Sequence, residues 1–346
     1  MDIKDIKKKN DELQQDDQQF SRARYTDLKE SVTLQGWPEV RGYDFNQPFD
    51  FEKFLNAYNT TGFQATNLGE AIEIVKQMRK EKATIFLGFT SNMASCGVRE
   101  IIAYLTQHKL VDVLCTSAGG VEEDIIKSLK PFVLGDFNAS GKMLREKGVN
   151  RTGNIFIPND RYIQWDKMMQ SFLKKLHDKQ KQTNTIINCE DFCSELGKEV
   201  HDEHSFVYWA AKNKIPLFCP SLTDGSIGDM IYFYKYQNRD FKIDITDGMV
   251  NIVNLALHAE KVGIIILGGG VAKHFVANAC LFREGADYAV YINTGYEGEG
   301  SNAGANPDEA VPWGKISDKA RAVKVWGEAS IIFPLLVAGA FIEEKK

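Results

Sequence analysis

The chain has 346 residues, and its 42 Lys or Arg against 47 Asp or Glu give a net charge of −5. With 43% hydrophobic and 26% charged residues, it resembles ordinary globular proteins and excludes a disordered, collagenous or disulfide-scaffold chain. The acidic balance argues against a nucleic-acid binder or a protein of anionic membrane surfaces, because both need a basic face. Glycine is frequent, with 28 residues against 9 prolines, which favours close backbone approaches over flexible linkers.

The first 40 residues are polar, with sparse apolar side chains at loosely helical spacing. These apolar residues are Ile3, Ile6, Leu13, Phe20 and Leu28. The pattern predicts a helical N-terminal extension over residues 1–40 that packs on another surface, such as a second subunit. Because this segment lacks the apolar core of a secretory signal and is too acidic for a transit peptide, we expect a soluble, cytoplasmic protein.

From Val40 onward, short apolar runs alternate with longer helical patterns. The predicted strands are Thr84–Phe89, Val111–Cys115, Asn154–Ile157, Ile215–Phe218, Gly263–Leu267, Tyr288–Asn293 and Val323–Trp326. The predicted helices include Val98–Lys109, His204–Asn213, Asp244–Val262, Val271–Arg283 and the apolar stretch Ala329–Ile342, which is too short to span a bilayer. The sequence therefore predicts an α/β fold, with one large Rossmann-like domain over residues 41–346 and a mostly parallel central sheet flanked by helices.

Six cysteines are present, and in a chain of this length without a secretory signal we expect them to be reduced. One group would permit a zinc site, because Cys189 and Cys193 are followed by His201 and His204. The two cysteines also suit one face of an amphipathic helix, and only seven residues separate the two pairs. We favour the helix-face interpretation and expect no metal.

Small polar residues and glycines follow four of the predicted strands. The four segments are TSNMASCG (90–97), TSAGGVEED (116–124), GGG (268–270) and TG (294–295). Since ligands of open α/β sheets bind beyond the carboxyl ends of the strands, backbone N–H groups there could approach a pyrophosphate. Tight turns would explain any single glycine equally well. The P-loop and the G-x-G-x-x-G fingerprint are both absent, which disfavours a P-loop NTPase and a conventional Rossmann dehydrogenase.

A second candidate site lies in PDEAVPWGKI (307–316). Lys315 follows Trp313 and Gly314, and burial of its amine would make it a nucleophile able to form an imine. A plain surface lysine is the alternative. Asp224, Asp229 and Glu309 could hold a cationic ligand, with Trp313 adding an aromatic face. For Asp224 the alternative is capping of a helix that begins near Ile227.

These segments, in this order, closely resemble the deoxyhypusine synthase family from about residue 37 to the C-terminus. The resemblance is carried by RGYDFN (41–46), TTGFQATN (60–67), TSNMASCG, TSAGGVEED, LTDGSIGDM (222–230), GGGVAKHF (268–275), ADYAVYINT (286–294) and PDEAVPWGKI. The family uses NAD to oxidise spermidine and releases 1,3-diaminopropane. It carries the 4-aminobutyl group as an imine on a lysine and passes it to one lysine of the translation factor 5A precursor.

The resemblance also implies residue roles. Lys315 matches the imine-forming lysine and His274 an active-site histidine able to move protons. The positions that match spermidine contacts are Asn159, Asp229, Gly269, His274, Gly300, Ser301, Asn302, Glu309, Trp313 and Lys315. Those that match NAD contacts are Ser91, Asn92, Ser95, Ser117, Ala118, Gly119, Glu123, Asp224, Thr294, Gly295, Glu328 and Ala329. The family forms homotetramers with sites at a dimer interface, and residues 1–40 could cover the entrance of a neighbouring site.

The chain departs from the family pattern mainly in one loop. Glu299, Asn302 and Ala303 stand where the family usually has Asp, Asp and Ser, and Glu328 stands where Asp is common. The missing carboxylate at Asn302 removes a contact worth about 1.5–3 kcal/mol if nothing replaces it. Two alternatives stay open. A homospermidine synthase that uses putrescine as acceptor would share the donor chemistry and the lysine. A non-catalytic paralogue that activates a hetero-tetramer is disfavoured, because Lys315, His274, Asp229 and Glu309 are retained.

Overall fold

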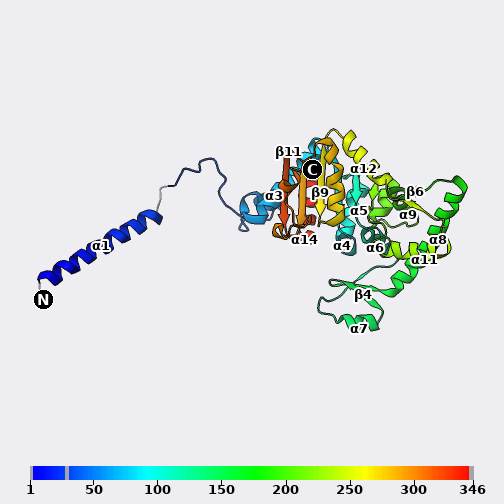
Figure 1. Ribbon diagram of the computed structural model, residues 1–346, viewed down its shortest axis with the longest axis horizontal. Coiled ribbons are helices and arrows are strands. Elements are labelled where there is room, and N and C mark those ends of the chain that lie inside the picture. The colour runs from blue at the N-terminus through cyan, green and yellow to red at the C-terminus, as the bar shows by residue number, and fades with distance from the viewer. Residues whose placement is uncertain (1–2, 28–30, 343–346) are drawn as a thin grey trace. The chain divides into compact units, whose positions relative to one another are not determined.

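The computed structural model describes residues 3–27 and 31–342. Its centre is a six-stranded sheet in the order β11-β10-β9-β1-β2-β7, and every pair of neighbouring strands is parallel. The strands are β1 Thr84–Phe89, β2 Val113–Cys115, β7 Leu217–Phe218, β9 Val262–Leu267, β10 Ala286–Asn293 and β11 Ile316–Trp326. Helices lie on both sides of this sheet (Figure 1), so the predicted α/β class and parallel sheet are confirmed.

Fourteen α-helices occur in the described residues. They are α1 Ile3–Asp27, α2 Phe51–Thr61, α3 Phe63–Lys80, α4 Asn92–Ser95, α5 Val98–Gln107, α6 Ala118–Leu129, α7 Gly141–Glu146, α8 Asn159–Thr183, α9 Cys189–Gly197, α10 Phe206–Asn213, α11 Ser226–Gln237, α12 Asp247–His258, α13 Gly270–Ala279 and α14 Ala329–Ala340. Short 3-10 turns follow at Leu281–Arg283, Glu297–Glu299 and Pro307–Ala310. Small separate sheets pair β3 Val133–Leu134 with β5 Ile155–Pro158 and β4 Val149–Thr152, and β6 Ile187–Asn188 with β8 Ile243–Asp244.

The alternation of strand side chains divides the core into two layers. In β9, Ile265 and Leu267 pack with α3, α5 and α14, whereas Ile264 and Ile266 pack with α12 and α13. A strand that is buried on both faces has no polar side, which explains why this run is apolar throughout. Gly88 in β1 lets α13 come close, because a Cβ there would lie 3.4 Å from both Ala272 O and the Val276 side chain of that helix.

Several predicted elements differ from the structure in their bounds or pairing, and three differ most. The segment Asn154–Ile157 does form a strand, but β5 is antiparallel in the small sheet with β3 and β4, which Figure 1 shows at a distance from the central sheet. The helix predicted to reach Val262 ends at His258, because Val262 already pairs with Thr84 as the first residue of β9. The final strand begins at Ile316 rather than Val323.

The chain falls into two compact units, Met1–Val40 and Arg41–Lys346. In the first unit α1 forms a helix over Ile3–Asp27, but residues 31–40 are not helical, so the helix is shorter than the predicted extension over 1–40, and Leu13 and Phe20 on it are exposed. In the second unit α9 has Cys189, Phe192, Cys193 and Leu196 buried on one face, which confirms the helix-face interpretation of the two cysteines. None of the helices in residues 3–27 and 31–342 is long and apolar enough to cross a membrane.

Candidate active site

Lys315 lies at the mouth of a pocket and contacts His274. Its Nζ is 3.2 Å from His274 Nε2 and 5.5 Å from the centre of the Trp313 ring. The pocket has a volume of about 330 Å³. Its lining residues are Lys273, His274, Ala277, Tyr291, Gly300, Ser301, Asn302, Ala305, Asn306, Glu309, Ala310, Trp313 and Lys315. The lysine, histidine, tryptophan and carboxylate singled out from the sequence therefore come together, although 41 residues separate His274 from Lys315.

His274 is suited to move a proton at the Lys315 amine. Partial burial, and then the charge of Lys315, lowers the pKa of His274 below its usual value, so the ring is neutral at neutral pH. A neutral ring with its proton on Nδ1 accepts a hydrogen bond from the Lys315 ammonium, and the other tautomer donates one to the free amine. Either arrangement lets a proton pass between these two atoms.

Two buried lysines hold the glycine-rich wall of the pocket in place. Lys273 Nζ donates to the carbonyl oxygens of Asn302 and Ala305 at 2.6 and 2.9 Å, and Lys324 Nζ donates to Gly295 O at 2.9 Å and to Gly304 O. Burial lowers the pKa of Lys273 to about 8, with Lys324 adding to the effect. Sequence reasoning missed both residues, since the only signal was a lysine inside an apolar pattern.

Asn302 and Glu309 each have a local role in the same wall. Asn302 Nδ2 donates to Gly270 O at 3.2 Å, which ties the loop to the start of α13. Glu309 Oε1 accepts from Asn306 N at 3.0 Å in a capping box, and its other oxygen is not used there. Gly269 is needed for close approach, because a Cβ there would lie 2.6 Å from the backbone of Ala303. A side chain at residue 269 would push this loop out of place.

The predicted cofactor residues gather at the carboxyl ends of the strands. Ser91, Asn92 and Ser95 follow β1, and Ser117, Ala118 and Gly119 begin α6 after β2. The two segments touch, since a Cβ on Gly119 would lie 2.8 Å from the Ser91 side chain. Neighbouring strand ends therefore place the α6 N-terminus, with its free N–H groups, beside a serine and an asparagine, as a pyrophosphate site requires.

The other predicted cofactor residues lie at the same edge of the sheet. Thr294 and Gly295 follow β10, while Glu328 and Ala329 begin α14 after β11. Gly295 N donates to Asn293 Oδ1 at 3.0 Å, and Trp326 Nε1 donates to Thr294 O at 3.1 Å. The charge of Glu328 contributes to raising the pKa of Cys96, after the larger effect of burial, so Glu328 lies within electrostatic range of the segment that follows β1.

Asp224 is exposed and does not cap α11, contrary to the alternative considered from the sequence. The cap residue is Gly225, and Glu122 Oε2 accepts from Ile227 N at 2.7 Å in place of a local side chain. A glycine is required at 225, because a Cβ would lie 2.8 Å from the Glu122 carboxylate. The Asp224 carboxylate is therefore exposed and does not bond to the N–H groups at the start of α11.

Glu123, on α6, is held in a half-buried position. Ser95 Oγ donates a hydrogen bond to its carboxylate, yet burial raises the pKa of Glu123 to about 7. The folded protein therefore keeps a proton on this carboxyl up to about pH 7, whereas the unfolded chain releases it near pH 4.5. Folding stability contributed by Glu123 is lost as the pH rises between these two values.

A Glu123→Gln variant is expected to be more stable than the wild type at pH 8 by up to about 3 kcal/mol, and to lose this advantage near pH 5. Urea unfolding at both pH values and one protein concentration measures the difference. Glu73→Gln, which removes an exposed carboxylate paired with Lys76, serves as the control. Stability curves of Glu123→Gln and wild type that run parallel from pH 5 to pH 8 would contradict the expectation.

One chain does not bring all the predicted site residues together. None of the predicted cofactor residues lines the Lys315 pocket, nor do Asn159 and Asp229. Lys315 O accepts from the N–H of Ala286, the first residue of β10, whereas Thr294 follows the last. The eight residues of β10 span about 23 Å, far more than a lysine side chain reaches. The Lys315 backbone and Thr294 thus lie at opposite ends of β10, whereas the pocket wall reaches the cofactor end, where a Cβ on Gly295 would lie 2.9 Å from Ala303 and Gly304.

Asp229 lies close to the predicted cofactor residue Asp224, since the charges of both carboxylates raise the pKa of Glu122 after the larger effect of burial. Asn159 begins α8, where its Oδ1 accepts from Asn150 Nδ2 at 2.8 Å, and Asp229 is exposed in the first turn of α11. Both helices lie on the side of the unit that carries the small β3-β5-β4 sheet (Figure 1).

Comparisons with known proteins agree on one family. Residues 53–340 match the family model for deoxyhypusine synthase. The deoxyhypusine synthase of Arabidopsis thaliana is 46% identical, over 96% of this chain and 98% of the relative. The homospermidine synthase of Senecio vulgaris is 47% identical, over 94% of this chain and 95% of the relative. A crystal structure from Entamoeba histolytica that bears the deoxyhypusine synthase name is 31% identical, with a TM-score of 0.63 over 87% of this chain and 96% of that one.

Proposed function

The chain belongs to the deoxyhypusine synthase family and is a transferase. We propose that it moves the 4-aminobutyl group of spermidine to one lysine of the translation factor 5A precursor. NAD would accept and return the hydride. The observation that carries this proposal is the Lys315–His274 contact inside a pocket that also presents Glu309 and the Trp313 ring. An amine nucleophile, a neutral base and a site for a cationic chain are the groups that this transfer needs.

The proposed chemistry balances without a further reagent. A hydride would pass from the carbon beside the secondary amine of spermidine to NAD held by the strand-end residues, and the N–H proton would leave to solvent, so that an imine forms. The amine of Lys315 adds to the imine carbon and displaces 1,3-diaminopropane, so the aminobutyl group becomes an imine on Lys315. The acceptor lysine then displaces Lys315, and the returned hydride reduces the new imine. His274 takes and gives the protons at Lys315 Nζ, and Trp313 and Glu309 hold the cationic chain.

The strand-end residues fit a dinucleotide. The α6 N-terminus approaches Ser91 closely enough to form a cradle for a pyrophosphate, and Glu123 and Asp224 offer carboxylates to ribose hydroxyls. NAD bound there supplies the hydride chemistry. The role of Ser91, Asn92, Ser95, Ser117, Ala118, Gly119, Thr294, Gly295, Glu328 and Ala329 would be to hold it.

The separation of the two groups of residues supports a site shared between subunits. None of the predicted cofactor residues lines the Lys315 pocket, so a second copy of the chain would supply the missing half of each site. We propose a homotetramer with sites at a dimer interface, in which residues 41–346 form the catalytic domain.

A homospermidine synthase remains the second candidate, because a relative with that name is as similar to this chain as the deoxyhypusine synthases are. The two activities differ in the acceptor, which is a protein lysine in one and putrescine in the other.

Incubation of the purified protein with NAD and labelled spermidine, plus either the factor 5A precursor or putrescine, tests the proposal. We expect label to appear in the protein acceptor. Label that appears only in homospermidine would replace the first function with the second, and turnover of neither would favour a non-catalytic paralogue.

A further inference from the structure

Lys324 connects two parts of the molecule that the proposed function assigns to different ligands. It lies on β11, and its side chain is only 6% exposed. Its Nζ donates to Gly295 O at 2.9 Å and to Gly304 O. Gly295 is a predicted cofactor residue, whereas Gly304 belongs to the wall loop, residues 300–306, most of which line the Lys315 pocket. One buried ammonium therefore holds a backbone oxygen from each side.

The backbone of the wall loop also packs directly on the segment that follows β10. A Cβ on Gly295 would lie 2.9 Å from the backbone of Ala303 and Gly304, and a Cβ on Gly304 would clash with Tyr296 O. With no side chain between them, these two stretches of backbone do not shift independently of each other. A displacement of Gly295 therefore moves the wall loop.

On its other side, the wall loop is joined to α13, the helix that carries His274. Asn302 Nδ2 donates to Gly270 O, at the start of this helix, at 3.2 Å. The contacts thus run without a gap from Gly295, through the wall loop, to the helix beside Lys315. Energetic coupling between two ligand sites requires a contiguous network of this kind.

The turn between β10 and the wall loop is exposed and contains glycine. Residues 296–302 are all exposed, and Gly298 and Gly300 among them have no side chain to pack. A segment of this kind loses conformational freedom when a ligand orders it. A second ligand that binds the ordered segment loses less freedom, so the first ligand tightens the binding of the second.

We propose that Lys324 is a positioning residue that links the predicted cofactor residues to the Lys315 pocket, so that NAD bound beside Gly295 tightens the pocket for the polyamine. This inference rests on the function proposed above and names the residue that connects its two ligands. Lys273 differs, because it donates to Asn302 O and Ala305 O, which both belong to the wall loop. By reciprocity, the polyamine tightens NAD binding by the same factor.

Calorimetric titration of the full-length protein with spermidine, without and with saturating NADH, tests the proposal. NADH already carries the hydride, so spermidine is not oxidised during the titration. We expect NADH to tighten spermidine binding at least about tenfold in the wild type and less than about threefold in Lys324→Met. Lys324→Gln, with an uncharged side chain one bond shorter, should reduce the factor at least about threefold, which keeps the test decisive if the methionine variant does not fold.

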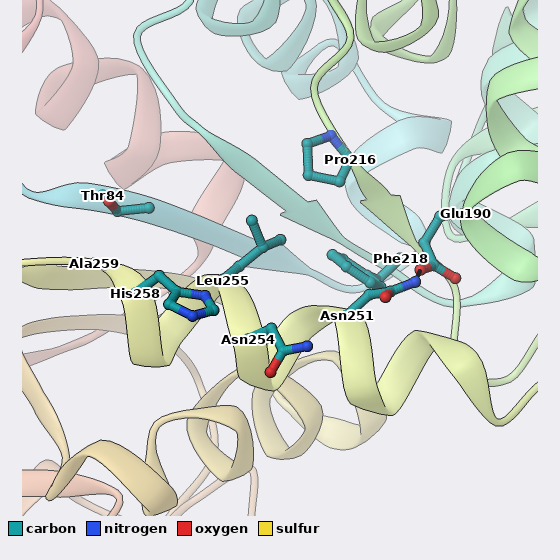
Figure 2. A pocket seen from close by; sticks show the side chains of 9 residues that line it. All are labelled: Thr84, Glu190, Pro216, Phe218, Asn251, Asn254, Leu255, His258 and Ala259. Carbon is teal, nitrogen blue, oxygen red and sulfur yellow. Dashed lines mark hydrogen bonds between the residues drawn. The ribbon is translucent and has the colours of Figure 1, made fainter.

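Two control variants separate this link from a general loss of binding. Lys273→Met should weaken spermidine binding but keep the NADH factor, because Lys273 holds only the wall loop. Asn254→Lys adds a positive charge at an exposed position in another pocket, of about 540 Å³ between α12 and β7. Figure 2 shows this pocket, which shares no lining residue with the Lys315 pocket. The variant should keep both the spermidine affinity and the factor.

The outcomes distinguish this proposal from the proposed function. Equal spermidine affinity with and without NADH in the wild type, or a factor that both Lys324 variants retain, would overturn the role of Lys324 alone. Loss of the factor in Lys273→Met would also overturn it, because any loosening of the wall loop would then suffice. A wild-type protein that binds no spermidine even with NADH would overturn both proposals. Absence of transfer with the factor intact would overturn only the proposed function.

Discussion

A Lys315→Arg variant is expected to lose aminobutyl transfer by at least about 10³-fold, because a guanidinium stays protonated and does not form the imine. The substitution keeps a positive charge beside Trp313 and His274, so the loss would report on nucleophilicity rather than on charge. Transfer of label from spermidine to the acceptor protein measures the rate. Borohydride trapping of labelled spermidine on the enzyme, in the presence of NAD, measures the imine itself.

Lys319→Arg is a matched control, since Lys319 is exposed near the start of β11, the strand that follows Lys315, and lies outside the Lys315 pocket. It should transfer and trap label at the wild-type rate. If Lys315→Arg retained either activity within tenfold of wild type, the imine mechanism on Lys315 would be wrong, whatever the acceptor.

The second large effect is expected at Asp124, which is fully buried between three helices. Arg99 Nε donates to its Oδ1 at 2.7 Å, and Val207 N donates to its Oδ2 at 3.2 Å at the start of α10. Asp124→Ala would remove the buried carboxylate that pairs with the Arg99 guanidinium. It would also leave the N–H groups at the start of α10 without their acceptor. We expect a loss of about 3–5 kcal/mol in the free energy of unfolding, measured by urea denaturation.

Asp124→Asn keeps an acceptor oxygen and should lose less than Asp124→Ala, which makes the test informative even if the alanine variant does not fold. Glu100→Gln is the control, because Glu100 is a partly exposed partner of Arg99 at 3.5 Å and is worth about 0–1 kcal/mol. Equal destabilisation by Asp124→Asn and Glu100→Gln would show that burial of this ion pair does not matter for stability.

The central sheet could be predicted because its strands carry their own signal. Thr84–Phe89 was predicted with the observed limits, and Gly263–Leu267 was one residue short, since short continuous apolar runs of strand length are typical of strands buried on both faces. The prediction was less accurate where local pattern and pairing disagree. The first residues of β11 are largely polar, and the register with β10 shifts between Ala286 and Tyr288, so only pairing in the folded sheet makes them a strand.

The sequence by itself determined the fold class, the family, and the residue types at four strand ends and at Lys315, because these depend on short patterns along the chain. Only the tertiary structure decided which groups meet. The Lys315–His274 contact, the capping of α11 by Glu122, and the lysines that hold the loop at Gly295 and Asn302 join segments that are far apart in sequence. Such contacts depend on strand order and helix packing, which no local pattern encodes.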